Sequence, residues 1–224
     1  MSAYPRRGSV WSVFVPLVLA SLMILPGTVT AQASNYPSLQ LPTASIRDYT
    51  GAIASGAGTS VLFQWREGVA SAMHLGLDVG LTDRKGSENL LGFIGGSIGS
   101  ELLRAEGEQP LDLLLTGGLG FAFGGGATIV RVPLGVSLGH TFALEDGMAL
   151  TPYVHPRVSL DLCSDCGRRG NRRTELSLNF DVGVDFRVNQ KFSVRVAGAF
   201  SGSDFFGNND SFAIGLNWRP GLVR

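Results

Sequence analysis

The sequence predicts an all-β fold: a transmembrane antiparallel up-and-down β-barrel of about ten strands, with eight or twelve as alternatives, following a cleaved signal peptide. Three observations lead to this fold class. Apolar residues alternate with polar or small residues over long segments from Ala52 onward. Glycine accounts for 31 of 224 residues, about twice its usual frequency. Beyond residue 33 no apolar run of 18 residues occurs, which excludes a spanning helix but not spanning strands of about 9 to 11 residues.

Residues 1–33 are predicted to be a secretory signal peptide. Two arginines precede a mostly apolar, uncharged run from Val10 to Leu25, and small residues follow at the spacing that signal peptidase accepts. We expect cleavage after Ala31 or Ala33. An uncleaved membrane anchor is the alternative, but the apolar run is short for a bilayer core of about 30 Å and contains Pro16.

The predicted mature chain is close to neutral. Removal of the signal peptide takes Arg6 and Arg7 from the 18 basic residues and none of the 18 acidic ones, which leaves 16 against 18. Nucleic-acid binding normally needs a basic stripe, so we expect no nucleic-acid partner. We divide the remainder into an N-terminal linker at 34–40, a barrel at 41–219 and a C-terminal tail at 220–224.

The alternation is clearest from Thr174 to Val188. Every second residue of this segment is a large apolar one, while the residues between them are polar, charged or glycine. A helix would scatter these apolar residues around its circumference, whereas a strand gathers them on one face. The apolar face consists of Leu176, Leu178, Phe180, Val182, Val184, Phe186 and Val188.

Similar segments recur along the chain, and one more strand is inferred from the order of the turns. Short turns and longer loops alternate, as is usual for spanning barrels. If the last strand ends on the periplasmic side, counting back makes the strand 52–65 run inward, so a weak additional strand at 41–49 must precede it. If the hairpin near 52–66 is divided differently, the barrel has eight or twelve strands. The predicted strands are 41–49, 52–65, 71–82, 89–103, 111–123, 128–144, 148–162, 174–188, 191–201 and 211–219.

Strand length and composition predict which solvent the apolar face meets. Strands of soluble proteins have about 5 or 6 residues, and most of the predicted ones are far longer. The apolar face is Val, Leu and Phe, as lipid requires, and the polar face mixes charges with small residues, as a narrow lumen requires. A soluble periplasmic ligand-binding barrel, the alternative, would reverse the two faces. Aromatic residues near strand ends predict an interfacial girdle of Trp65, Phe142, Phe186, Phe192 and Trp218.

The last predicted strand has the pattern Phe212-x-Ile214-x-Leu216-x-Trp218. Together with the signal peptide and the alternation over residues 40 to 219, it resembles the bacterial outer-membrane protein β-barrel family, the small OmpA/OmpX-like barrels. The resemblance implies the cell outer membrane as location, outer-membrane lipid as surroundings and the barrel-insertion machinery as an assembly partner. The chain departs from the pattern because it continues to Arg224 instead of ending on an aromatic residue.

The predicted inward face carries a mixed set of charged and polar residues. The interior of a barrel of eight to ten strands is barely wider than its side chains, so we expect these groups to pair with one another and to fill the lumen. The set comprises His74, Asp78, Asp112, Arg131, Tyr153, His155, Arg157, Asp161, Glu175, Asp181, Asp185, Arg187 and Arg195.

We therefore expect a structural or surface-interaction role with a plugged lumen, no enzymatic activity, and neither metal nor cofactor. A small pore for ions or solutes is one alternative. An outer-membrane hydrolase acting on lipid A or peptides is another, and it needs His and a carboxylate or Ser to meet at one membrane level. For a site facing lipid, His140 would have to meet Ser137 or Ser159, whose predicted faces differ from its own.

The predicted loop 163–173 holds two further features. Cys163 and Cys166 form a C-x-x-C pair, for which we expect a structural disulfide in an oxidising envelope; a redox-active pair is the alternative, and a zinc site would need more ligands. A cluster of arginines follows and can either pair with the phosphates of lipopolysaccharide or form a solvated loop. The cluster consists of Arg168, Arg169, Arg172 and Arg173.

Overall fold

The structure is a computed structural model that describes residues 36–84, 90–106, 109–124, 127–164, 173–202 and 210–220. Over these residues the chain forms eleven strand segments and one turn of 3-10 helix at Glu145–Gly147. No helix in this part of the chain is long and apolar enough to cross a membrane. The strands are β1 (Arg47–Ser55), β2 (Gly58–Ala70), β3 (Met73–Arg84), β4 (Leu90–Leu103), β5 (Asp112–Gly124), β6 (Ala127–Gly139), β7 (Phe142–Ala143), β8 (Ala149–Ser164), β9 (Arg173–Arg187), β10 (Phe192–Gly202) and β11 (Ser211–Trp218).

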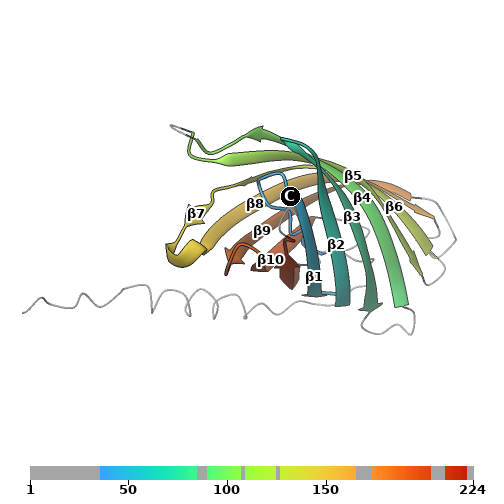
Figure 1. Cartoon of the computed structure of the whole chain (residues 1–224). Helices are drawn as coiled ribbons and strands as arrows, with labels where there is room; N and C mark the ends of the chain where they lie inside the picture. Colours follow the sequence, from blue (N-terminus) through green and yellow to red (C-terminus); the bar gives the residue numbers. More distant parts are fainter. Residues whose placement is uncertain are drawn as a thin grey trace, which may run out of the picture.

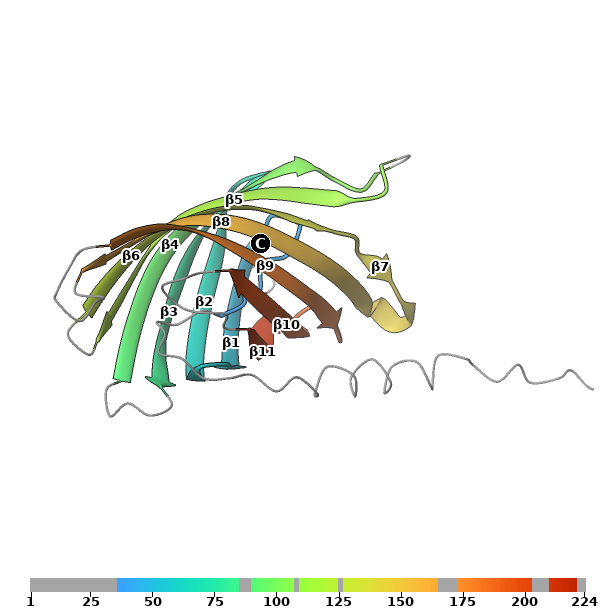
Figure 2. The same ribbon diagram turned by 180° about the vertical axis from the view of Figure 1, so that it is seen from behind.

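The strands close into an antiparallel barrel, as Figures 1 and 2 show from opposite sides. Neighbouring strands pair in sequence order, β1 also pairs with β11, and β6 pairs with β8. β7 has only two residues and continues the line of β6 along β8 after a break at His140 and Thr141. Counted in this way, the described part of the chain is a ten-stranded barrel, which confirms the predicted fold class.

The two faces of the wall differ as the alternation predicts. In β9, Ser177 and Asp181 are fully buried, whereas Leu176 and Leu178 are 69% and 68% exposed. The other strands repeat this division, with large apolar side chains outside and polar or small ones inside. An apolar outer surface of this extent suits lipid, because large apolar patches are rare on soluble monomers.

The first hairpin differs from its prediction. The expected strand at 41–49 begins only at Arg47, and the expected strand at 52–65 spans a turn at Gly56 and Ala57 that separates β1 from β2. Residues 66–70, which separate the expected strands 52–65 and 71–82, lie within β2. The sequence conceals this turn because only small residues occur from Ala54 to Ser60, so the alternation of side-chain size is weak where the chain reverses.

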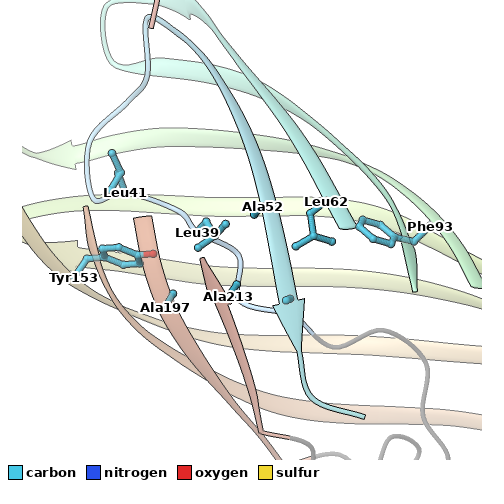
Figure 3. Close-up of a cluster of buried hydrophobic side chains, with 9 residues drawn as sticks. Leu39, Leu41, Ala52, Leu62, Phe93, Tyr153, Ala197 and Ala213 are labelled. Atoms are coloured by element: carbon cyan, nitrogen blue, oxygen red, sulfur yellow. The ribbon is translucent and has the colours of Figure 1, made fainter. Parts of the chain in front are cut away.

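Residues 36–46, which we call the N-terminal segment, are neither an external linker nor a strand. Most of them lie inside the barrel, where Leu39 is 1% and Leu41 is 8% exposed, whereas Ile46 at the end of the segment is 65% exposed. Figure 3 shows both leucines among side chains from the surrounding strands. This apolar cluster is the core of the barrel, and it consists of Leu39, Leu41, Ala52, Ala54, Leu62, Phe93, Tyr153, Ala197 and Ala213.

Candidate functional site

Two ion pairs join neighbouring strands inside the lumen. Arg66 of β2 pairs with Asp78 of β3. Between β6 and β8, the guanidinium of Arg131 donates two hydrogen bonds to Asp161, at 2.8 and 3.0 Å. Because the two members of each pair come from adjacent strands, every one of these charges has an opposite charge beside it, as a buried charge requires.

Arg195 of β10 is the centre of a larger charge network. Its Nε lies 2.9 Å from Asp185 Oδ1, and its Nη2 lies 3.3 Å from Asp48 Oδ2. It also donates to Thr50 Oγ1 at 3.1 Å. Arg219, which follows β11, reaches Asp185 at 3.2 Å. The network therefore links the first strand to the last three strands around the barrel closure.

A second cluster holds the N-terminal segment at Ser38. The Ser38 amide and hydroxyl both donate to Asp181 Oδ2, at 3.0 and 2.7 Å. The hydroxyl also lies 2.6 Å from His155 Nδ1, and His155 Nε2 lies 2.9 Å from Thr116 Oγ1. The other oxygen of Asp181 accepts from Arg157 at 2.7 Å. Because the Ser38 hydroxyl donates its proton to Asp181, the hydrogen bond between Ser38 and His155 needs a proton on His155 Nδ1. In a neutral imidazole Nε2 then carries no proton, so it accepts a hydrogen bond from the Thr116 hydroxyl.

Further contacts hold the segment along its length. Leu39 adopts a φ of 51°, a left-handed conformation that costs a non-glycine residue about 1–2 kcal/mol and that the surrounding contacts must offset. The remaining contacts come from five strands: Gln64 to the Ser38 carbonyl at 3.0 Å, Ser137 to the Gln40 carbonyl at 2.8 Å, the Ala44 amide to Glu101 at 3.1 Å, the Ser45 amide to His74 at 3.2 Å, and Arg195 to the Leu39 carbonyl at 3.5 Å.

The predicted lumen residues occupy inward-facing positions of their strands. Besides those in the clusters above, Asp112 accepts a hydrogen bond from the Ala105 amide at 2.8 Å, and Tyr153 is 2% exposed. Glu175 and Arg187 occupy the same face of β9. The prediction missed Ser38, Asp48, Arg66 and Arg219. Their positions were assigned to a linker, a weak strand, a turn and the end of the last strand, in that order. The alternation of Asp48 and Thr50 with outward residues is the signal that could have found β1.

The five predicted girdle residues all face outward. Trp65 and Trp218 both pair in register with Tyr49, whose ring stacks on Trp218 with centroids 5.5 Å apart. Trp218 also pairs with Phe192, so three of the five lie side by side near the start of β1. Trp65 was expected near a strand end but lies within β2. The exposed girdle residues are Trp65, Phe142, Phe186, Phe192 and Trp218.

Several predicted site residues stay untested. Cys163 is disulfide-bonded, but Cys166 lies outside the described residues, so the loop pairing remains a prediction. Of the arginine cluster only Arg173 is described, as the first residue of β9. Among the described residues no three His, Cys, Asp or Glu side chains are placed to hold a metal ion.

His140 does not form the alternative lipid-facing site. Its ring meets that of Phe142 edge-on, with centroids 4.6 Å apart. Ser137 points into the lumen, where it donates to the Gln40 carbonyl, and Ser159 is likewise buried on the inward face of β8. The histidine and the two serines are therefore on opposite sides of the wall.

No protein-family model matches the chain, and no curated protein matches it. Solved structures do: a bacterial polysaccharide outer membrane secretin matches with a TM-score of 0.48 and 10% identity, over 80% of this chain and 67% of that one. The NanC porin matches with a TM-score of 0.42 and 8% identity, over 78% and 100%. The N-terminal β-barrel domain of Pseudomonas aeruginosa OprF matches with a TM-score of 0.36 and 8% identity, over 77% and 95%.

These likenesses concern the path of the strands. At 10% identity or less they transfer no residue's role to this chain. The resemblance to small outer-membrane barrels stated from the sequence is confirmed at the level of architecture, by a closed antiparallel ten-stranded barrel.

Proposed function

We propose that this protein is an outer-membrane β-barrel with a structural or surface-interaction role, whose lumen is closed to steady ion flow by its own N-terminal segment. The observation that carries the proposal is the docking of residues 36–46 inside the barrel. An apolar outer face around a polar interior supports the membrane location, because a soluble barrel has the opposite arrangement.

The closure has a physical basis. An ion crossing the lumen would have to pass the buried Leu39 and Leu41, which offer it no ligands in place of water. The charges beside them are already paired, as with Arg195 and its two aspartates. Opening the lumen therefore requires the segment to leave, and its hydrogen bonds to several strands oppose that movement.

Planar-bilayer conductance of the refolded protein tests this closure. We expect a folded and silent barrel. Leu39→Lys places a second cation near Arg195, whose Nη1 lies 3.5 Å from the Leu39 carbonyl, and should expel the segment and produce channels. Ile46→Lys is the matched control, because Ile46 belongs to the same segment but is 65% exposed. Steady channels from the unaltered protein would overturn the closed barrel and make the small pore the leading function.

We also propose lipopolysaccharide as a partner of the arginine cluster at 168–173. Four guanidinium groups within six residues suit bidentate contacts to phosphate. Replacing the four arginines with glutamine should weaken binding of the refolded protein to purified lipopolysaccharide, measured by calorimetry. Replacing the exposed Lys191 in the turn after β9 is the control. If this change also weakens lipopolysaccharide binding, the loss reflects overall charge and not the arginine cluster. Unchanged binding by the fourfold variant would remove lipopolysaccharide as a partner.

The proposal includes no enzymatic activity, yet one observation favours a hydrolase as the second candidate. Thr116, His155, Ser38 and Asp181 form a continuous chain of hydrogen bonds, in which His155 Nε2 accepts from the Thr116 hydroxyl. It differs from a serine-hydrolase triad because the Ser38 hydroxyl lies between the imidazole and the carboxylate, which are 3.6 Å apart. Hydrolysis of p-nitrophenyl esters by the folded protein, abolished in Thr116→Val, would replace the non-catalytic proposal.

A further inference from the structure

The N-terminal segment is held in the lumen largely through its main chain. Six amide or carbonyl groups between Ser38 and Ser45 form hydrogen bonds with side chains of the wall, at distances of 2.8 to 3.5 Å. Every peptide has such groups, so this part of the recognition does not depend on the sequence of the segment. The wall residues come from six strands and are Gln64, His74, Glu101, Ser137, Asp181 and Arg195.

The segment is not bound as an additional strand. Within the described part of the chain, residues 36–45 form no hydrogen bond to the backbone of a strand, and the first such bond joins the Gly68 amide to the Ile46 carbonyl at 2.6 Å. The strands around the segment already pair with a neighbour on both sides. Leu39, with its φ of 51°, also interrupts any extended run. The lumen therefore differs from a sheet edge that binds a peptide by strand addition.

Two adjacent side chains of the segment add specificity. The Ser38 hydroxyl donates to Asp181 at 2.7 Å and lies 2.6 Å from His155 Nδ1. The next residue, Leu39, is packed in the apolar cluster that Figure 3 shows, where it is 1% exposed. A chain that fits this lumen therefore presents a small hydroxyl residue followed by leucine.

The lumen also selects for an uncharged chain. Residues 36–46 contain no charged residue. The charges that face them have partners in the wall, since Arg195 lies between two aspartates and Asp181 pairs with Arg157. A charged residue brought into the apolar cluster would be buried without a partner, which is costly.

We propose that the lumen is a binding site for an uncharged, non-helical peptide, and that the N-terminal segment occupies it as a built-in ligand. A separate peptide with a small hydroxyl residue followed by leucine binds there once the segment is displaced. The site rests on the closed barrel proposed above, because the segment that closes the lumen is also the ligand. The same wall residues that hold the segment hold the added peptide.

Binding of a synthetic peptide to the refolded Leu39→Lys variant tests the site. The peptide has the sequence of residues 36–46 with an acetyl and an amide end, so it carries no charge. Native mass spectrometry in dodecyl maltoside micelles counts the bound copies. We expect one saturable peptide on each Leu39→Lys barrel and none on the unaltered barrel, whose site is already filled. The bound peptide should also silence the channels of the variant in planar bilayers.

The two readouts separate the site from the closure. A Leu39→Lys barrel that conducts ions but binds no peptide would overturn the site and leave the closed barrel standing. A folded Leu39→Lys barrel that stays silent would also overturn the site, because its lumen would then hold a charged chain. Steady channels from the unaltered protein would instead overturn the closed barrel. If Leu39→Lys does not fold, Ser38→Asp displaces the segment by placing a second carboxylate beside Asp181.

Serine variants of the wall test the recognition of the main chain. In the Leu39→Lys background, Ser137→Ala removes the hydroxyl that bonds the carbonyl of Gln40 at 2.8 Å and should weaken peptide binding about fivefold. Ser201→Ala is the matched control, because Ser201 is also a buried serine of the inward face but its hydroxyl has no hydrogen-bond partner. Its binding should stay unchanged. Equal losses in the two variants, or none in either, would contradict main-chain recognition.

Variants of the peptide test the side-chain part of the recognition. A peptide with Ser38→Ala lacks the hydroxyl that Asp181 and His155 share, and should bind about tenfold more weakly. Thr43→Val is the matched control, since Thr43 is partly exposed and takes no part in the contacts above. A peptide with the same residues in scrambled order should not bind. Equal binding of the scrambled peptide would mean adsorption to the apolar surface and would overturn the site.

Discussion

The barrel has two unlike sides. From β8 through β11 to β1, the wall is sealed by charge: Arg195 and Asp185 lie inside, and the pairing of β8 with β9 runs without a break from Ala149 to Cys163. From β4 to β6, glycines thin the wall and Pro133 interrupts the ladder. A barrel can therefore be closed around its circumference while the pairing within one part of its wall is incomplete. The first side supports the plug, and the second has a gap of two residue pairs between β5 and β6.

The largest expected difference between the two sides lies in their arginines. Arg195→Met leaves Asp185 and Asp48 buried without this partner and should cost about 3–5 kcal/mol of unfolding free energy. Arg131→Met removes one partner of Asp161, which Ser177 still bonds at 2.8 Å, and should cost about 1–3 kcal/mol. Urea unfolding in lipid vesicles, followed by tryptophan fluorescence, measures both. Equal losses would mean that the two sides are equally sealed.

Glycine substitutions give a smaller contrast. A Cβ at Gly183 of β9 would overlap the ring of Tyr153, which is buried in the apolar cluster, so Gly183→Ala should destabilise the barrel by about 1–3 kcal/mol. Gly120→Ala meets no atom closer than 3.9 Å and should stay within about 0.5 kcal/mol of the unaltered protein. The same unfolding assay applies. A costly Gly120→Ala would show that the thin wall is as tightly packed as the sealed one.

The smallest expected effect is a gain. Pro133→Val supplies the missing amide hydrogen and a residue that strands favour, so one further ladder bond can form, with a net value of about 0.5–1.5 kcal/mol. Amide exchange of neighbouring β5 residues, measured by nuclear magnetic resonance in micelles, should slow. Pro152→Val on β8 is a control outside this gap, and it should leave exchange in β5 unchanged. Unaltered exchange in the Pro133 variant would mean that the proline does not cause the interruption.

Much of the wall was predictable because alternation is a local property of the sequence. Thr174 to Val188 was expected as a strand, and β9 runs over Arg173–Arg187 with the predicted faces. The first hairpin was misplaced because Ala52 and Ala54 are small on the inward face, so side-chain size does not mark the turn that follows. Arg66 was lost from the lumen set for the same reason, since the shifted register assigned it to a turn.

The alternation of residues is enough to predict a barrel with an apolar outside and a charged inside, because a period of two places the apolar and polar residues on opposite faces of every strand. Which charges pair, and the entry of the N-terminal segment into the lumen, follow only from the folded chain. The Ser38 cluster joins residues separated by as many as 143 positions, and its members meet only when the barrel closes. No local pattern encodes such a meeting, since it depends on the registers of all the strands at once.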